Sequence, residues 1–238
     1  MPIPEKGLVY TGSQEPKPPR AGVRERSIQI QVGHADLVGD LAVPEHATGL
    51  VIFAHGSGSS RLSPRNRYVA GILNGSGLAT LLVDLLTIQE EHVDVQTREF
   101  RFNIGLLAER LIGLTEWQTA HPDVSALALG YFGASTGSAA ALIAAAARPE
   151  RVRALVSRGG RPDLAASSLP RVQSPTLFIV GGDDAPVIEL NQQAFDVLQC
   201  DKKLEIVPGA THLFEEPGAL ESVAHLAADW YREHICNG

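Results

Sequence analysis

Cysteine is nearly missing from this chain, whose 238 residues contain only Cys200 and Cys236. The two stand in no spacing typical of a metal site, and in the absence of a secretion signal they are expected to be reduced thiols. Residues 1–6 lack the apolar core of a signal peptide. No apolar run approaches the roughly 20 residues that a membrane-spanning helix needs. These absences predict a soluble, cytoplasmic protein without a metal.

Basic residues are outnumbered, with 20 Lys and Arg against 27 Asp and Glu and a formal net charge of −7. No long basic stripe is present, so we expect neither nucleic acid nor a membrane as partner. The length suits a single domain with a buried core. Residues 1–24 are polar and rich in proline, which predicts an extended tail, and residues 25–238 are expected to form the domain.

Apolar runs alternate with helical stretches along most of the chain. Residues 27–32 and 35–43 are predicted to form an antiparallel edge hairpin around the turn at 33–34. Further strands are predicted at 50–54, 79–83, 126–132, 154–156, 176–180 and 204–207, and helices at 68–73, 102–120, 139–147, 187–198 and 220–234. This alternation predicts an α/β fold with a mostly parallel sheet, covered on both faces by helices. Ligands of such sheets bind beyond the carboxyl ends of the strands.

A G-x-S-x-G sequence at residues 133–137 follows one of these strands and precedes a helix rich in small residues. A serine in that position must sit on a very tight turn, and the flanking glycines relieve the crowding that the turn creates. This arrangement is typical of a nucleophile elbow, so Ser135 is predicted to be a nucleophile.

A serine hydroxyl needs a base within hydrogen-bond reach, and that base needs a carboxylate to orient it. His212 follows the last predicted strand, which is where this chemistry places the base. Asp184 follows the strand before it and is our preferred acid. Asp183 and, after an earlier strand, Asp163 remain alternatives. Six further histidines are expected to have ordinary surface or core roles: His34, His46, His92, His121, His225 and His234.

The oxyanion that forms during such a reaction needs two preorganised donors. One is predicted to be the backbone N–H of Thr136, at the positive end of the helix after the serine. The other is predicted to be the backbone N–H of Ser57, in the glycine-containing loop 55–60. His55 in that loop is expected to be structural rather than a second base.

Arginines are frequent in the same loops. Arg158 and Arg161 flank two glycines after a strand, and Arg61, Arg65 and Arg67 follow the loop at 55–60. Guanidinium groups there can hold a carboxylate or phosphate of the substrate. The alternative is that they form ion pairs with the acids of the chain.

Taken together, these motifs resemble the α/β-hydrolase superfamily and, within it, the dienelactone hydrolase-like branch. The motifs lie at 55–58, 133–137, 181–184 and 209–212. The resemblance implies an eight-stranded sheet, no cofactor and hydrolysis of an ester-like bond. Dienelactone hydrolases proper use a cysteine nucleophile, whereas this elbow carries Ser135, so a serine esterase is the safer expectation. The chain also resembles small hydrolase domains joined to phosphoribosyltransferases.

Only residues 158–174 separate two predicted strands where a cap usually enters, which is too few for a helical lid. The sequence therefore predicts an open, shallow site and a small-molecule ester as substrate, cleaved through an acyl-enzyme. The alternative is a hydrolase fold kept as a non-catalytic ligand-binding or interaction module.

Overall fold

The computed structural model describes residues 22–236. Within them, eight strands form one sheet: β1 (Val23–Val32), β2 (Ala35–Pro44), β3 (Gly49–Ala54), β4 (Leu78–Val83), β5 (Ala128–Ala134), β6 (Val152–Arg158), β7 (Thr176–Gly181) and β8 (Lys202–Val207). The α-helices are α1 (Pro64–Gly75), α2 (Ile88–Thr97), α3 (Ile104–Ala120), α4 (Thr136–Ala147), α5 (Ala185–Val197) and α6 (Ala219–Tyr231). A π-helical turn, η3 (Arg232–Cys236), follows α6.

The strands lie in the order β1-β2-β4-β3-β5-β6-β7-β8. β1 and β2 form the predicted antiparallel edge hairpin, and β2 also runs antiparallel to β4. All other neighbouring pairs are parallel. The fold is therefore the predicted eight-stranded, mostly parallel α/β sheet. Its six parallel strands end at a common edge, where their loops meet.

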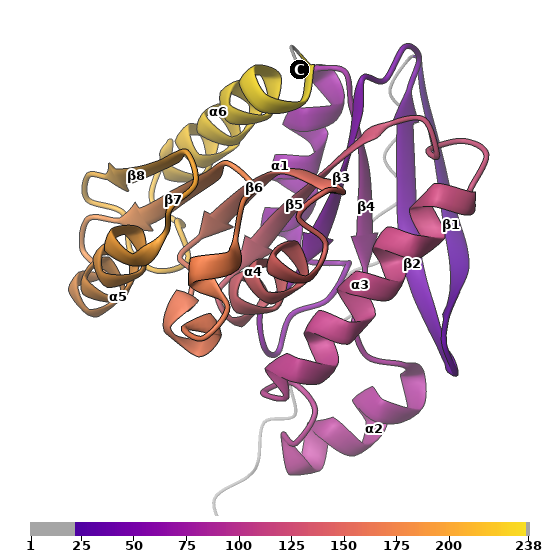
Figure 1. Cartoon of the computed structure of the whole chain (residues 1–238), viewed down its shortest axis with the longest axis horizontal. Coiled ribbons are helices and arrows are strands. Elements are labelled where there is room, and N and C mark those ends of the chain that lie inside the picture. Colours follow the sequence, from indigo (N-terminus) through magenta and orange to yellow (C-terminus); the bar gives the residue numbers. More distant parts are fainter. Residues whose placement is uncertain (1–21, 237–238) are drawn as a thin grey trace, which may run out of the picture.

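Helices cover both faces of the sheet, as predicted (Figure 1). Apolar side chains of α1 and α6 pack in one buried cluster, and those of α3, α4 and α5 contribute to the other. The central strands β3, β4, β5 and β7 are buried along nearly their whole length, which explains why they read as continuous apolar runs rather than as alternating ones. Among residues 22–236, none of the helices is both long and apolar enough to span a membrane.

The predicted tail at residues 1–24 lies almost wholly outside the described residues. Its last two residues, Val23 and Arg24, belong to β1. These two residues pair with Pro44 and Val43 of β2.

Helix α2, which lies beyond the carboxyl end of β4 (Figure 1), was not predicted from the sequence. This helix is polar and buries only Asp94, so it lacks the apolar periodicity by which the other helices were found. A capping box marks its start: Thr87 accepts from the Glu90 N–H, and the Glu90 carboxylate accepts from the Thr87 N–H.

Between β6 and β7, the chain forms two short 3-10 helices, η1 (Pro162–Ala165) and η2 (Leu169–Arg171). Both are buried in part against the rest of the domain. This connection therefore contains no helical lid, as its length predicted.

Candidate active site

Ser135 occupies a strained turn between β5 and α4. Its φ of 50° and ψ of −121° are values that residues with a side chain rarely adopt. The turn is held by hydrogen bonds to the end of β6: the Ser135 N–H donates to the Arg158 carbonyl at 3.2 Å, and the Ser135 carbonyl accepts from the Arg161 N–H at 3.1 Å. This is the backbone geometry that the elbow motif predicted.

Both glycines of the motif are required by close approach of the backbone. A Cβ at Gly133 would lie 2.5 Å from the Cα of Ser138. A Cβ at Gly137 would lie 2.1 Å from the carbonyl oxygen of Ala54, in β3. Neither position has room for any side chain, so the glycines allow α4 to begin directly against the sheet.

His212 contacts Asp184, with Nδ1 lying 2.7 Å from Oδ2. Because a carboxylate only accepts, Nδ1 carries the hydrogen and Nε2 is left as the basic nitrogen. The neighbouring Asp183 has an exposed side chain. The Asp163 carboxylate accepts from Arg161, with Nε lying 2.8 Å from Oδ1 and Nη2 lying 2.7 Å from Oδ2. Of the three aspartates considered, Asp184 is therefore the one that orients the imidazole.

The loops that carry these two side chains are fastened to each other. The Asp183 N–H donates to the Ala210 carbonyl at 3.0 Å, and the Gly182 N–H donates to the Val207 carbonyl at 2.8 Å. The loop after β7 and the loop after β8 are thus held in register. This explains how residues 28 positions apart form a short contact.

Ser135 and His212 lie against two adjacent residues at the end of β6, Ser135 against Arg158 and His212 against Gly159. A Cβ on Gly159, whose φ is +51°, would lie 3.3 to 3.5 Å from the carbonyl oxygen, Cε1 and Nδ1 of His212. The backbone carbonyl of the preceding residue, Arg158, accepts from the Ser135 N–H. In the described part of the chain, no hydrogen bond joins the Ser135 hydroxyl to His212. Catalytic hydrogen bonds of this kind often tighten only when substrate binds.

Of the two predicted oxyanion donors, the Thr136 N–H belongs to the first residue of α4. Amides of the first helical turn have no partner inside their helix and are thus available to an anion. The Ser57 N–H, in contrast, donates to the Oγ1 of Thr136 at 2.8 Å, so this predicted donor is engaged here. The Thr136 hydroxyl retains its own hydrogen and is a further donor at the same place.

His55 has a structural position, with both ring nitrogens bonded to the backbone. Its Nε2 accepts from the Leu85 N–H at 3.2 Å, so its Nδ1 carries the hydrogen that is donated to the Gly56 carbonyl at 3.0 Å. Burial lowers the pKa of His55 below 6.5, although the Gly56 carbonyl opposes this. A neutral imidazole thus ties the loop after β3 to the loop after β4.

The buried imidazole of His55 predicts a loss of stability at mildly acidic pH. Its folded-state pKa lies below the unfolded value of 6.5, so the unfolded chain binds a proton that the folded protein does not. The contribution of His55 to stability should not change with pH above pH 6.5. The free energy of unfolding should fall as the pH drops from 6.5 toward the folded-state pKa of His55. Thermal unfolding of the wild type and of His55→Gln at about pH 7.5 and about pH 5.5 measures this. Equal shifts in Tm for both proteins would contradict the prediction.

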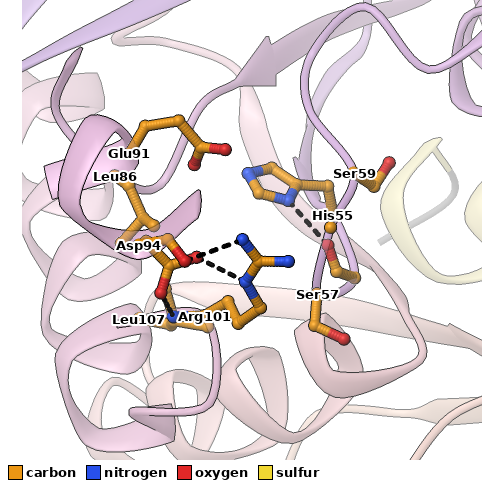
Figure 2. Close-up of a pocket in the computed structure, with 10 residues that line it drawn as sticks. His55, Ser57, Ser59, Leu86, Glu91, Asp94, Arg101 and Leu107 are labelled. Carbon is orange, nitrogen blue, oxygen red and sulfur yellow. Dashed lines mark hydrogen bonds and ion pairs between the residues drawn. The ribbon is translucent and has the colours of Figure 1, made fainter. Parts of the chain in front are cut away.

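A small pocket that was not predicted from the sequence lies beside the loop at 55–59. Its opposite wall comes from α2 and the segment after it, where Arg101 extends between Asp94 and the loop (Figure 2). Asp94 accepts from Arg101 Nε and from the N–H groups of Phe100 and Arg101, at 2.8 and 2.9 Å for the two amides. Burial raises the pKa of Asp94, but these hydrogen bonds outweigh it and the net pKa is lowered. The ion pair therefore fixes the segment after α2 to the helix.

The two arginines predicted to bind substrate differ in their surroundings. Arg161 forms a bidentate ion pair with Asp163. This agrees with the alternative given above, in which these arginines form ion pairs with acids of the chain. Arg158 is only 8% exposed, and its guanidinium has no hydrogen bond or ion pair within residues 22–236.

Comparisons with known proteins show the family of this chain. A profile of the dienelactone hydrolase family matches residues 44–235. Two curated relatives from Mycobacterium tuberculosis strains CDC 1551 / Oshkosh and H37Rv are each 56% identical over 214 residues, which is 90% of this chain. Their names assign them provisionally to the phosphoribosyl transferases. The chain spans about half of their length, 47% in each case.

Solved structures include a dienelactone hydrolase from Anabaena variabilis, which is 59% identical with a TM-score of 0.89, covering 90% of this chain and 99% of that one. Est1E from Butyrivibrio proteoclasticus shares the fold at 17% identity, with a TM-score of 0.75 and coverage of 89% and 99%. The strained elbow, the sheet order and these matches lead to one assignment: the chain belongs to the dienelactone hydrolase family and has the α/β-hydrolase fold.

Proposed function

We propose that this protein is a serine hydrolase that cleaves a small carboxylic ester, or a related lactone or thioester, through an acyl-enzyme. The observation that carries the proposal is the contact between His212 and Asp184 at the edge of the sheet where Ser135 sits in its elbow. The contact holds an imidazole in the tautomer that a general base needs. The family, which is one of hydrolases, supports the same reaction class.

In the proposed mechanism, the Ser135 oxygen attacks the ester carbonyl while Nε2 of His212 takes the hydroxyl proton. The oxyanion that forms is stabilised by the Thr136 N–H and by the Thr136 hydroxyl, whose oxygen accepts the Ser57 N–H. Collapse of this intermediate breaks the bond to the alcohol, which leaves with the proton from His212. Water then loses a proton to His212 and attacks the acyl carbon. The acid departs and the Ser135 hydroxyl is restored.

Two features favour a small substrate over a large or interfacial one. The connection between β6 and β7 contains only short 3-10 helices, so no helical lid rises from it over the end of the sheet. The net charge of −7 disfavours a polyanionic partner such as nucleic acid.

The test is covalent labelling with a fluorophosphonate probe, followed by mass spectrometry of the labelled peptide. We expect one adduct, on Ser135, in the native protein, and none in the heat-unfolded protein or in Ser135→Ala. A native protein that stays unlabelled and hydrolyses no ester would overturn the proposal and leave the alternative of a non-catalytic ligand-binding or interaction module.

A further inference from the structure

Asn191, on α5, is a polar residue with no exposed surface. Its amide Nδ2 donates to the Val187 carbonyl, one turn earlier on the same helix, at 2.8 Å. The same nitrogen also donates to the Gly160 carbonyl at 3.0 Å, although the two residues are 31 positions apart in the chain. Buried polar groups cost stability unless they are hydrogen-bonded, so a buried amide of this kind needs these acceptors. The amide therefore fastens α5 to the segment that follows β6.

Both neighbours of Gly160 contact the groups of the proposed reaction. On one side, the Arg161 N–H donates to the Ser135 carbonyl at 3.1 Å and so supports the elbow. On the other side, Gly159 lies against His212, where a Cβ would come within 3.3 to 3.5 Å of the imidazole and of the backbone carbonyl. A shift of the Gly160 carbonyl is therefore expected to displace the supports of the nucleophile and of the base together.

The helix that carries Asn191 also begins at the acid. Asp184 is the N-cap of α5, and its carbonyl accepts from the Ile188 N–H at 3.0 Å. Asn191 lies about two turns further along the same helix. Through α5, the contact with Gly160 is thus connected to the carboxylate that orients His212. One buried amide bears on all three segments that carry the proposed reacting groups.

The surroundings of Gly160 show which part of the Asn191 side chain the fold uses. A Cβ on Gly160 would lie 2.0 Å from the Ser157 Oγ and 2.7 Å from the Ser138 Oγ, so this segment is closely packed. Both hydroxyls are buried, and neither they nor the Oδ1 of Asn191 have a hydrogen-bond partner among residues 22–236. An unsatisfied buried oxygen is a cost. Because the amide nitrogen is bonded twice and the oxygen is not, the donor is what Asn191 contributes.

We propose that Asn191 is a positioning residue: by holding the Gly160 carbonyl, it keeps the Ser135 elbow and the His212 imidazole in register with Asp184. This inference rests on the proposed function, because it takes those three residues as the reacting groups. Asn191 is fully buried, so it acts through the backbone and not on substrate. Its loss should lower kcat, since a misplacement of about 1 Å far from the chemistry can cost on the order of 100-fold.

The first test compares Asn191→Leu with a matched variant at the opposite edge of the sheet. Asn191→Leu keeps the approximate size of the side chain and removes the donor to Gly160. The control is Asn74→Leu. Asn74 is also a buried helical asparagine whose Nδ2 donates twice, to the Leu78 carbonyl and the Thr80 Oγ1, each at 3.0 Å. It lies near the end of α1, beside the first residue of β4, and so at the amino edge of the sheet.

Both variants should lower Tm, because each leaves buried acceptors without their hydrogen bonds. Only Asn191→Leu should lower kcat for p-nitrophenyl acetate, by about 10- to 100-fold, with KM within about twofold of the wild type. The rate of fluorophosphonate labelling of Ser135 should fall with kcat. If Asn191→Leu does not fold, Asn191→Ala and Asn74→Ala form the same comparison. A kcat that is unchanged, or lowered equally in both variants, would overturn the positioning role.

The second test does not depend on turnover. NMR of the imidazole nitrogens reports which of them carries the hydrogen, and His212→Ala identifies the signals of this ring. We expect the Nδ1–H tautomer in the wild type and in Asn74→Leu, and a mixture with the Nε2–H tautomer in Asn191→Leu. If no ester is hydrolysed but the tautomer depends on Asn191, the proposed function fails and the positioning role stands. If all variants hydrolyse esters alike and keep the same tautomer, the positioning role fails and the function stands.

Discussion

Ser135→Ala and His212→Ala are each expected to lower kcat for p-nitrophenyl acetate by about 10⁴-fold or more, and the double variant is expected to lose little beyond either single one. The physical reason is that the two side chains act in one proton transfer, so removing either leaves the other without a function. Binding and the oxyanion donors remain in all three variants and sustain a small residual rate.

The measurement is steady-state kinetics of the three variants beside the wild type, with circular dichroism and thermal unfolding to confirm that each is folded. Ser135 is partly exposed, and the His212 side chain is 38% exposed, so neither replacement opens a cavity in the core. Multiplicative losses in the double variant would show that the two residues act independently, which would contradict the mechanism.

Asp184→Asn is expected to lower kcat by about 10³- to 10⁴-fold with little change in KM. The carboxylate accepts from Nδ1 of His212 at 2.7 Å, which keeps the basic electron pair on Nε2. An amide at this position can offer an N–H instead, which favours the opposite tautomer and leaves the proton on Nε2. The base is then lost although the shape of the site is retained.

The chain supplies a matched control in the preceding residue. Asp183 has an exposed side chain, and its contribution to the site is the backbone N–H that donates to Ala210. Asp183→Asn preserves that bond and should leave kcat within about threefold of the wild type, as expected for a surface substitution. Equal losses in the two variants would refute the assignment of Asp184.

The strongly periodic elements were predictable because their patterns arise from burial alone. Buried strands such as β3 and β7 appear as continuous apolar runs, and α3 and α6 as long helical stretches. The polar helix α2 was not predictable in this way, since only Asp94 of its residues is buried. Its capping box at Thr87 and Glu90 is a local signal of a helix start, which a search for apolar periodicity does not detect.

Side-chain partners at the site were less predictable than the positions of the loops. Asp183, Asp184 and Asp163 are chemically identical in the sequence, and the contact with His212 distinguishes one of them only after the loops of β7 and β8 are joined. Likewise, the Ser57 amide was predicted as an oxyanion donor, but its hydrogen bond to Thr136 was not predicted.

The sheet, the elbow at Ser135 and the order in which serine, acid and histidine follow the strands were predictable from the pattern of amino acids alone. These features depend on hydrophobic period and on steric limits at Gly133 and Gly137, which act over a few residues. The tertiary structure sets which of the arginines near Ser135 has no carboxylate partner among the described residues. That outcome depends on distances between loops far apart in the chain: among residues 22–236, Arg158 is buried with no partner for Nε and Nη1, whereas Arg161 is paired with Asp163.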